Sequence, residues 1–147
     1  MGRRIVVLSA VIALAGCNSP DDVTKNGAED LVRKSLKDPD SAKFSSEFIV
    51  RSKPDEKGIV FVGVCGLVNA RNGFGGYAGN ARFVAVSSES SQVGPSYPFM
   101  AQIENSKTSR PGTAADGTRR ATIFESVYWN QYCVDAAHPP MFTAGMD

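Results

Sequence analysis

The residues of this chain that could perform covalent chemistry are three cysteines and a single histidine, namely Cys17, Cys65, Cys133 and His138. A thiol beside an imidazole could act as a nucleophile, because the histidine would remove its proton. His138 lies in a proline-rich tail, which is a poor setting for a catalytic base. One histidine without a cysteine cluster gives no zinc-like spacing, and the serine hydrolase pattern GxSxG is absent. The sequence therefore predicts no catalytic residue, no metal and no cofactor.

Residues 1–16 have the features of a secretory signal peptide. A basic start at Arg3 and Arg4 is followed by an apolar run over residues 5–15. That run is too short to be a mature membrane span. We therefore expect an exported protein.

The end of this signal, Leu14-Ala15-Gly16-Cys17, resembles the lipobox of bacterial lipoproteins. The resemblance implies cleavage after Gly16 and attachment to Cys17 of a diacylglyceryl group and a further acyl chain such as palmitate. Such chains anchor a protein firmly, since each buried methylene contributes about 0.8 kcal/mol. Asn18, where aspartate would signal inner-membrane retention, favours the outer membrane, and we expect the domain to face the periplasm. An ordinary signal peptide with an incidental cysteine is the alternative.

Once Cys17 is acylated, Cys65 and Cys133 remain as an exported pair in an oxidising compartment. Such a pair most simply forms a disulfide. It would close a loop of nearly seventy residues, which on the chain-entropy model stabilises a fold by roughly 4 kcal/mol. The sequence thus predicts a bond that ties the central strand to the C-terminal element.

The charge of the mature chain argues against nucleic acid as a partner. Without the signal, fourteen basic residues stand against fifteen acidic ones, and no basic stripe is present to neutralise phosphates. The partners that we expect are the membrane, through the N-terminal lipid, and an envelope protein.

The element that organises the chain is the run over residues 59–70, where both alternating sets of side chains are apolar. This pattern predicts a strand that is covered on both faces and is therefore central. A second strand is predicted at residues 82–86. Five of the eight residues from Asn72 to Gly79 are glycine or asparagine, so the two strands should form a hairpin with a glycine-rich turn.

Before this hairpin, residues 17–25 are predicted to be a lipidated, mobile tether. An amphipathic helix then begins at Asn26, because Glu29 three residues later fits a capping box and apolar residues follow at helical spacing. The helix ends before Pro39, which cannot continue it.

A corner at residues 38–44 leads into a strand over residues 44–51. Alternation places Phe44 and Phe48 on its one buried face. We therefore expect helix, corner and strand to pack around these two rings.

Residues 87–96 are rich in serine without apolar periodicity and are predicted to be a surface loop. A further strand is expected at residues 97–103. Residues 104–117 are polar, contain two turn-forming Pro-Gly and Asp-Gly pairs, and are predicted to be a long exposed loop.

Apolar residues recur at helical spacing over residues 123–132, which predicts a C-terminal helix, and residues 136–147 are predicted to be a loose tail. Residues 26–135 should therefore form one α+β domain with a small antiparallel sheet of three or four strands, an N-terminal and a C-terminal helix, and one disulfide.

The glycine-rich turn is the candidate binding site. It matches neither GxxxxGK[ST] nor GxGxxG, and a strand follows it, so a phosphate-binding loop is not predicted. Its glycines could display aromatic side chains, which offer contact area at low entropic cost. A tight turn without function is the alternative. The candidate binding residues are Asn69, Arg71, Asn72, Phe74 and Tyr77.

Two segments resemble small bacterial and prophage-type exported proteins. These share a D-P-x-S-A-x-F corner, here residues 38–44, and a C-G-x-V-N-x-R-N-x-F-G-G-Y strand and turn, here residues 65–77. The resemblance covers about half of the mature chain, residues 31–83. It implies a fold that includes the disulfide of Cys65, and no mechanism, because the group has no established activity.

The sequence as a whole favours a lipid-anchored envelope protein that is no enzyme and acts by binding or as a structural accessory. One alternative is a prophage-type lipoprotein that excludes phages or masks a receptor. Another is an envelope enzyme or enzyme inhibitor, which would bring Glu47, Asn69, Arg71 and Asn72 together in one deep pocket.

Overall fold

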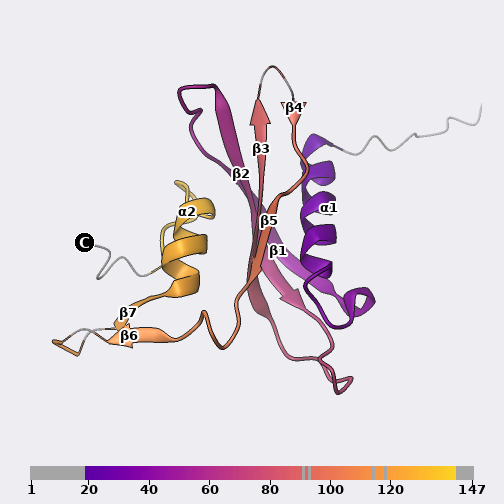
Figure 1. Ribbon diagram of the computed structural model, residues 1–147, viewed down its shortest axis with the longest axis vertical. Coiled ribbons are helices and arrows are strands. Elements are labelled where there is room, and N and C mark those ends of the chain that lie inside the picture. Colours follow the sequence, from indigo (N-terminus) through magenta and orange to yellow (C-terminus); the bar gives the residue numbers. More distant parts are fainter. Residues whose placement is uncertain (1–18, 91, 93, 114, 118, 142–147) are drawn as a thin grey trace, which may run out of the picture.

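A computed structural model of the chain describes residues 19–90, 92, 94–113, 115–117 and 119–141. The predicted signal peptide and Cys17 lie outside the described residues. An antiparallel sheet stands at the centre of the molecule, with helical segments on both of its faces (Figure 1). The elements are, in chain order, α1 (Pro20–Arg33), the 3-10 turn η1 (Pro39–Ser41), β1 (Lys43–Arg51), β2 (Ile59–Asn69), β3 (Ala81–Ser90), β4 (Gly94–Pro95), β5 (Met100–Ile103), β6 (Pro111–Thr113), β7 (Arg119–Thr122), the π-helix η2 (Phe124–Trp129) and α2 (Asn130–Tyr132).

The main sheet has five strands, all antiparallel to their neighbours. β2 lies between β1 and β3, while β4 and β5 pair with successive parts of the other edge of β3. The predicted central strand and its hairpin with β3 are confirmed, and Val62, Val64 and Cys65 of β2 are buried. The predicted α+β class is therefore correct. β6 and β7 form a separate two-stranded sheet.

The N-terminal helix begins at Pro20 rather than at Asn26. Ser19 caps it, because its Oγ accepts a hydrogen bond from the Asp22 amide (3.2 Å) while the Ser19 amide donates to Asp22 Oδ2 (3.0 Å). Proline suits the first position of a helix, where no amide hydrogen is needed. Residues 20–25, which were predicted to belong to a tether, are therefore helical.

β1 contains a bulge at Ser46, whose φ is +53°, and its pairing with β2 shifts register between Ser45 and Phe48. An extra residue exchanges the two faces of a strand from that point onward. Phe44 accordingly packs toward α1 and Phe48 toward the opposite face. The prediction that both rings share one buried face is wrong.

The two faces of the sheet have separate cores. The α1 face buries Ala28, Val32, Val64, Val68, Phe83 and Ala85. The C-terminal face buries Cys65, Val84, Val86, Phe124, Trp129 and Cys133. The predicted disulfide is confirmed on this second face, where it joins β2 to the residue after α2 with a Cα–Cα distance of 5.9 Å.

Two predicted loops contain strands. β3 continues through Ser90, so the surface loop predicted at residues 87–96 is wrong for its first four residues, and Ser87 is buried. β6 lies within the predicted loop at residues 104–117. Serine concealed the end of β3, which pairs with the distant start of β2, and Pro-Gly concealed β6, which pairs locally with β7.

The beginning of the predicted loose tail is held against the body. The side chain of Asn130 forms two hydrogen bonds of 3.0 Å with the backbone of Met141. His138 stacks on Phe48, with ring centroids 3.8 Å apart. The prediction of a loose tail is therefore wrong for residues 136–141, and residues 142–147 lie outside the described part.

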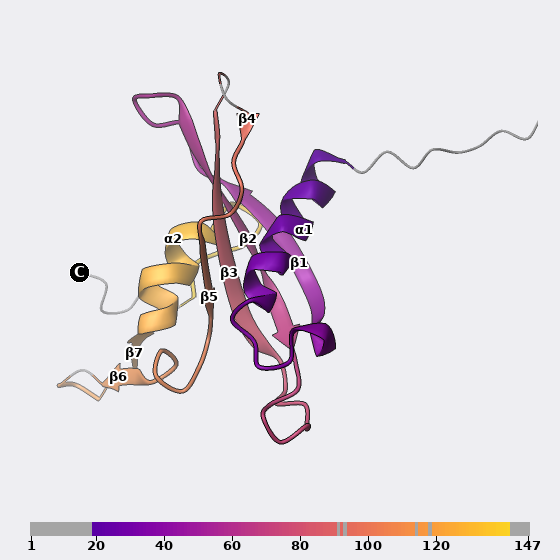
Figure 2. The same cartoon turned by 45° about the vertical axis from the view of Figure 1, so that its right-hand side comes forward.

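The start of α1 and β4 lie at one end of the molecule, and the glycine-rich turn between β2 and β3 lies at the opposite end (Figures 1 and 2). The molecule therefore has an N-terminal end and a turn end, and the candidate binding residues belong to the turn end.

Candidate binding surface

The turn between β2 and β3 is held together by Asn72. Its Oδ1 accepts hydrogen bonds from the amides of Phe74 (2.9 Å) and Gly76 (3.2 Å), and its own amide donates to the Gly76 carbonyl (2.8 Å). Gly75 has a φ of +81°, which favours glycine. The loop is thus hydrogen-bonded internally, and the predicted binding residue Asn72 serves to shape it.

Phe74 is displayed by this turn. Its side chain is 99% exposed. Burying a phenylalanine contributes about 1.5–3 kcal/mol, and a side chain on a hydrogen-bonded turn loses little freedom when it is bound. Phe74 is therefore available at the turn end as an apolar side chain for contact with another molecule.

The corner formed by η1 supports the base of the turn. Ser41 Oγ accepts a hydrogen bond from the Arg71 amide (2.8 Å) and donates to the Asp38 carbonyl (2.8 Å). The Tyr77 hydroxyl donates to the Ser41 carbonyl (3.4 Å). The η1 corner and the glycine-rich turn, which are about thirty residues apart in the sequence, therefore meet in space. We call residues 38–43 together with residues 71–77 the corner-and-turn surface.

Two cations flank the aromatic ring in this surface. Lys43 Nζ lies 4.7 Å and the Arg71 guanidinium carbon 5.6 Å from the centroid of Tyr77. Both distances permit cation–π attraction, which is worth about 0.5–1 kcal/mol at exposed sites. Asp38 and Asp40 lie on the adjoining corner, so the surface carries both signs of charge around its aromatic groups.

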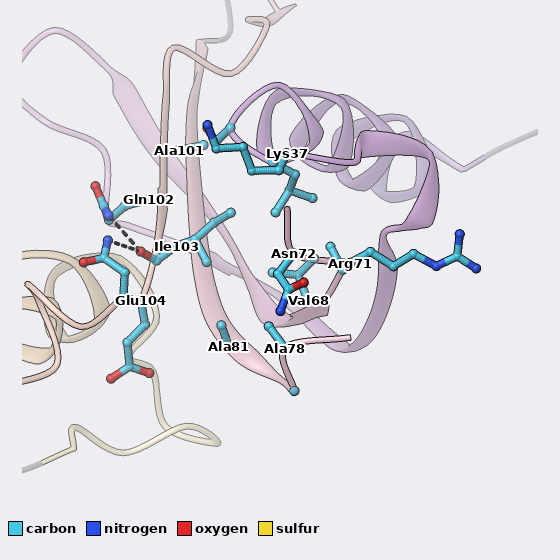
Figure 3. A pocket seen from close by; sticks show the side chains of 15 residues that line it. Lys37, Val68, Arg71, Asn72, Ala78, Ala81, Ala101, Gln102, Ile103 and Glu104 are labelled. Atoms are coloured by element: carbon cyan, nitrogen blue, oxygen red, sulfur yellow. Dashed lines mark hydrogen bonds between the residues drawn. The ribbon is translucent and has the colours of Figure 1, made fainter. Parts of the chain in front are cut away.

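A pocket of about 520 Å³ adjoins the turn (Figure 3). It exists because α1 ends at Arg33 and leaves the lower part of the α1 face uncovered. Its floor consists of small apolar side chains, including Val68, Ala70, Ala78, Ala81 and Ala101. The Arg71 side chain extends away from the pocket (Figure 3). The pocket is therefore mainly apolar, with polar groups such as Asn72 and Gln102 beside it.

The four polar residues of the enzyme alternative, Glu47, Asn69, Arg71 and Asn72, do not line one common pocket. Arg71 and Asn72 line this pocket, whereas Asn69 and Glu47 do not. Asn69 ends β2, and its buried Oδ1 has no hydrogen-bond partner among the described residues. The side-chain oxygen of this predicted binding residue is thus not displayed.

Glu47 instead lies between the sheet and α1. Its Oε1 is buried and has no hydrogen-bond partner in the described part of the chain. Gly66 makes room for it, since a Cβ there would lie 3.0 Å from Glu47 Cγ. Burial, followed by the negative charge of Glu29, raises the pKa of Glu47 to about 7. A strictly alternating strand would place Glu47 on the face opposite to Phe44. The bulge at Ser46 instead turns the Glu47 side chain toward α1, so its burial could not be predicted from the sequence.

Cys65 and Cys133 form the disulfide, so neither of these two sulfurs is a free thiol in this structure. His138 Nδ1 lies 2.8 Å from Asp135 Oδ1. Within residues 19–141, leaving aside the four undescribed positions, no group of three or more His, Cys, Asp or Glu side chains could hold a metal ion.

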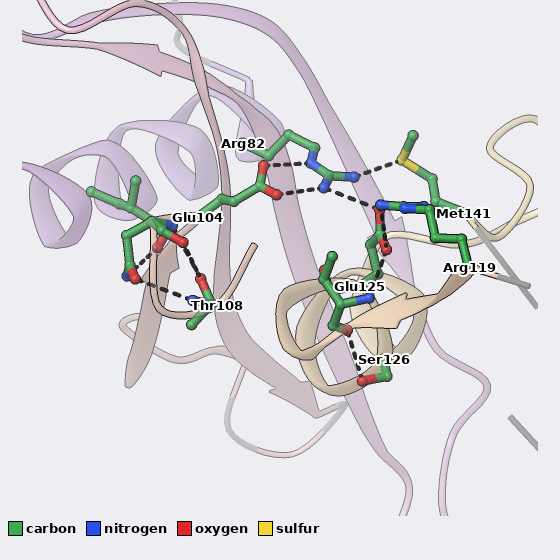
Figure 4. Close-up of polar contacts among 10 residues, drawn as sticks. Arg82, Glu104, Thr108, Arg119, Glu125, Ser126 and Met141 are labelled. Carbon is green, nitrogen blue, oxygen red and sulfur yellow. Dashed lines mark hydrogen bonds and ion pairs between the residues drawn. The ribbon is translucent and has the colours of Figure 1, made fainter. Parts of the chain in front are cut away.

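A polar network on the C-terminal face holds η2 to the sheet (Figure 4). Glu125 is 2% exposed and forms a capping box with Thr122, through hydrogen bonds of 2.8 and 3.0 Å. It also pairs with Arg82 (3.3 Å) and Arg119 (3.4 Å), and Arg82 pairs with Glu104 (2.7 Å). Burial works against ionisation of Glu125, but the Thr122 amide and Arg119 hold its pKa below the ordinary value.

Sequence reasoning missed this network, although the Thr-x-x-Glu spacing before an apolar run is a capping-box signal. The ion pairs themselves join residues that are far apart in the chain. The arrangement is a structural clamp.

No protein-family model, curated protein or solved structure matches the chain. Within the described residues, no helix has the length and apolar character needed to cross a membrane.

Proposed function

We propose that this protein is a lipid-anchored component of the cell envelope, at the outer membrane and facing the periplasm, which binds an envelope protein and performs no catalysis. The observation that carries the proposal is Phe74, which is fully exposed on a hydrogen-bonded turn that the η1 corner supports. The lipobox-like segment before Cys17 and the disulfide fit an exported, membrane-attached chain.

The geometry of the N-terminal end supports this arrangement. Cys17 precedes the helix cap Ser19 by two residues, which span at most about 7 Å. The fourteen residues of α1 then extend for about 21 Å. A lipid on Cys17 would therefore hold the N-terminal end near the membrane, and the corner-and-turn surface would project toward periplasmic partners (Figure 1).

The chemistry of the surface defines the partner that it fits. Phe74 would enter an apolar depression, and exposed aromatic and arginine groups are the side chains that most often dominate binding energy. Lys43, Arg71, Asp38 and Asp40 would form a polar rim around it. A protein surface with an apolar recess and mixed charges meets these requirements.

The test is photocrosslinking in intact membranes with a photoreactive amino acid at position 74. We expect a crosslinked envelope protein, and we expect its affinity to fall by roughly tenfold or more in the Phe74→Ala variant, because one buried ring contributes about 1.5–3 kcal/mol.

Phe99→Ala is the matched control, since Phe99 is an exposed phenylalanine outside the corner-and-turn surface. An equal loss of affinity in both variants, or none in Phe74→Ala, would contradict the proposal. Mass spectrometry of the membrane-extracted protein tests acylation of Cys17 independently.

A further inference from the structure

A groove of about 760 Å³ lies along the N-terminal half of α1, beside the segment that connects β4 to β5. The lining residues come from three places, namely α1 (Pro20, Val23, Thr24, Gly27, Asp30), the connecting segment (Ser96, Tyr97, Pro98) and the sheet (Arg51, Ser87, Glu89). The groove therefore has an apolar part and a polar part.

The apolar part is open to solvent. Val23 and Tyr97 are each 59% exposed. Gly27 allows the chain to approach the helix, because a Cβ there would lie 3.4 Å from the Pro98 ring. Lys34 Nζ lies 5.6 Å from the centroid of the Tyr97 ring. The exposed rim thus combines an aliphatic group with an aromatic ring that has a polar tip, and a lysine amine lies beside that ring.

The polar part of the groove carries more negative than positive charge, because Asp30 and Glu89 line it with Arg51 as the one cation of the lining. Arg51 pairs with Asp21 (2.6 Å) and with Glu89 (3.3 Å). Ser87 is buried beneath the groove. The groove consequently offers no cationic excess that would select an anionic ligand.

The position of the groove relative to Cys17 indicates what covers it. Pro20 and Val23 belong to the first turn of α1, directly after the Ser19 cap. Cys17 precedes the cap by two residues, which span at most about 7 Å, so its lipid would lie close to the start of the helix. Any bilayer that holds those acyl chains must therefore come close to the exposed rim.

We infer that the rim of this groove docks on the lipid surface at the boundary between headgroups and acyl chains, and so fixes the orientation of the domain on its membrane. The inference rests on the proposed acylation of Cys17. Amphipathic rings and lysine stems are suited to this boundary, with their apolar parts inward and their polar tips in the headgroup layer. Because the groove lining has no cationic excess that would attract anionic headgroups, zwitterionic lipid suffices as the partner.

The experiment uses the full mature lipoprotein in zwitterionic vesicles whose acyl chains are brominated near the carbonyl end, and measures quenching of tryptophan emission. Acylation of Cys17 is verified first by intact mass. The Tyr97→Trp variant should lose emission relative to unbrominated vesicles. The Phe74→Trp variant, which reports on the turn end, and the wild type, whose single tryptophan lies on the C-terminal face, should not.

Two further variants distinguish binding of the rim to lipid from quenching that arises only because the acylated Cys17 holds the rim close to the membrane. In Tyr97→Trp with a flexible glycine–serine spacer inserted after Asn18, quenching should persist, because the rim itself has affinity for lipid. Adding Val23→Asp to the spacer variant should abolish quenching, since an exposed carboxylate is costly at this depth.

Failure of Tyr97→Trp to be quenched in acylated protein would overturn the inference and leave the proposed function intact. Loss of quenching on insertion of the spacer, or quenching that requires anionic lipid, would also overturn it. An unmodified Cys17 would overturn the proposed anchor and this inference together.

Discussion

The two faces of the central sheet are covered by helical segments of different kinds, which are held in different ways. On the α1 face, a capped fourteen-residue helix packs through small and branched apolar side chains. The same face holds Glu47, whose buried Oε1 has no hydrogen-bond partner among the residues that the structure describes. On the C-terminal face, six residues of π-helix and three of α-helix are fastened by a disulfide and by the paired charges around Glu125.

The difference shows that a long helix and a short helical segment are held to the same sheet by different interactions. A π-helix is rare and is usually no more than a single turn, so η2 depends on covalent and ionic links to stay in place. α1 is long enough to depend on capping and apolar burial, and its face tolerates a carboxyl that is costly to ionise. Substitutions on both faces test this contrast.

Removal of the disulfide should have the largest effect, because it frees the C-terminal face. We expect the Cys65→Ala/Cys133→Ala double variant to lose about 4 kcal/mol of unfolding free energy, measured by urea denaturation, since the bond closes a long loop. Wild-type protein in excess reductant is the control and should unfold at the same midpoint. Unchanged stability would mean that the ionic clamp alone holds this face.

Two buried glycines of β2 allow one methyl group to be added on each face of the sheet, at Gly63 on the C-terminal face and at Gly66 on the α1 face. In Gly63→Ala the new Cβ would overlap the Tyr132 carbonyl oxygen, so η2 and α2 must move and stability should fall by about 3 kcal/mol. In Gly66→Ala the Cβ would lie 3.0 Å from Glu47 Cγ and from the Phe83 ring. That loss should be smaller, about 1–2 kcal/mol. Thermal unfolding of both variants measures the difference. A larger loss of stability in Gly66→Ala than in Gly63→Ala would refute the view that the C-terminal face tolerates an added methyl group less well.

Glu125→Gln should cost about 2 kcal/mol, because it removes the charge that Arg82 and Arg119 face while glutamine keeps the capping box. The control is Arg119→Gln, which removes a more exposed partner and should cost less than about 1 kcal/mol. Urea denaturation of both variants measures the difference. If Arg119→Gln were the more damaging change, the clamp would not be centred on Glu125.

Glu47→Gln should stabilise the protein at alkaline pH. The folded-state pKa of Glu47, about 7, exceeds its ordinary value of 4.5. Its protonated form therefore contributes stability that is fully present below about pH 4.5 and is lost as pH rises to about 7. Allowing for partial solvent screening, we expect a gain of about 1–2 kcal/mol at pH 8 and little change at pH 4.

The readout is urea denaturation of wild type and Glu47→Gln across this pH range. Glu29→Gln is a second probe, since removing the neighbouring charge should lower the pKa of Glu47 and move the wild-type transition to lower pH. Parallel pH profiles in wild type and Glu47→Gln would show that Glu47 is not the titrating group.

The parts of the fold that could be read from the sequence are those set by local composition. Residues 59–70 are apolar on both alternating sets, and a strand with that pattern has to be central. Cys65 and Cys133 were the only cysteines left after Cys17, so their pairing followed from chemistry alone. In the corner-and-turn surface, the exposure of Phe74 and Tyr77 agrees with the glycine-rich turn that displays them.

The parts that could not be read depend on single residues with exceptional roles or on distant partners. Ser46 looks like any polar strand residue, yet its positive φ reverses the faces of β1 and buries Glu47. Ser19 was overlooked as a cap because the segment before Asn26 is polar, although proline after a serine signals a helix start. The pairing of Arg82 with Glu125 carries no local signal, because 43 residues separate them.

The break at Ser46 also affects how the molecule avoids self-association. β1 forms one edge of the sheet, where unpaired backbone groups can recruit a strand from another copy. The bulge interrupts the even spacing of those groups within a nine-residue strand. An incoming strand can therefore align with the segment before Ser46 or with the one after it, but not with both. Neighbouring copies are thus kept from joining into a continuous ribbon.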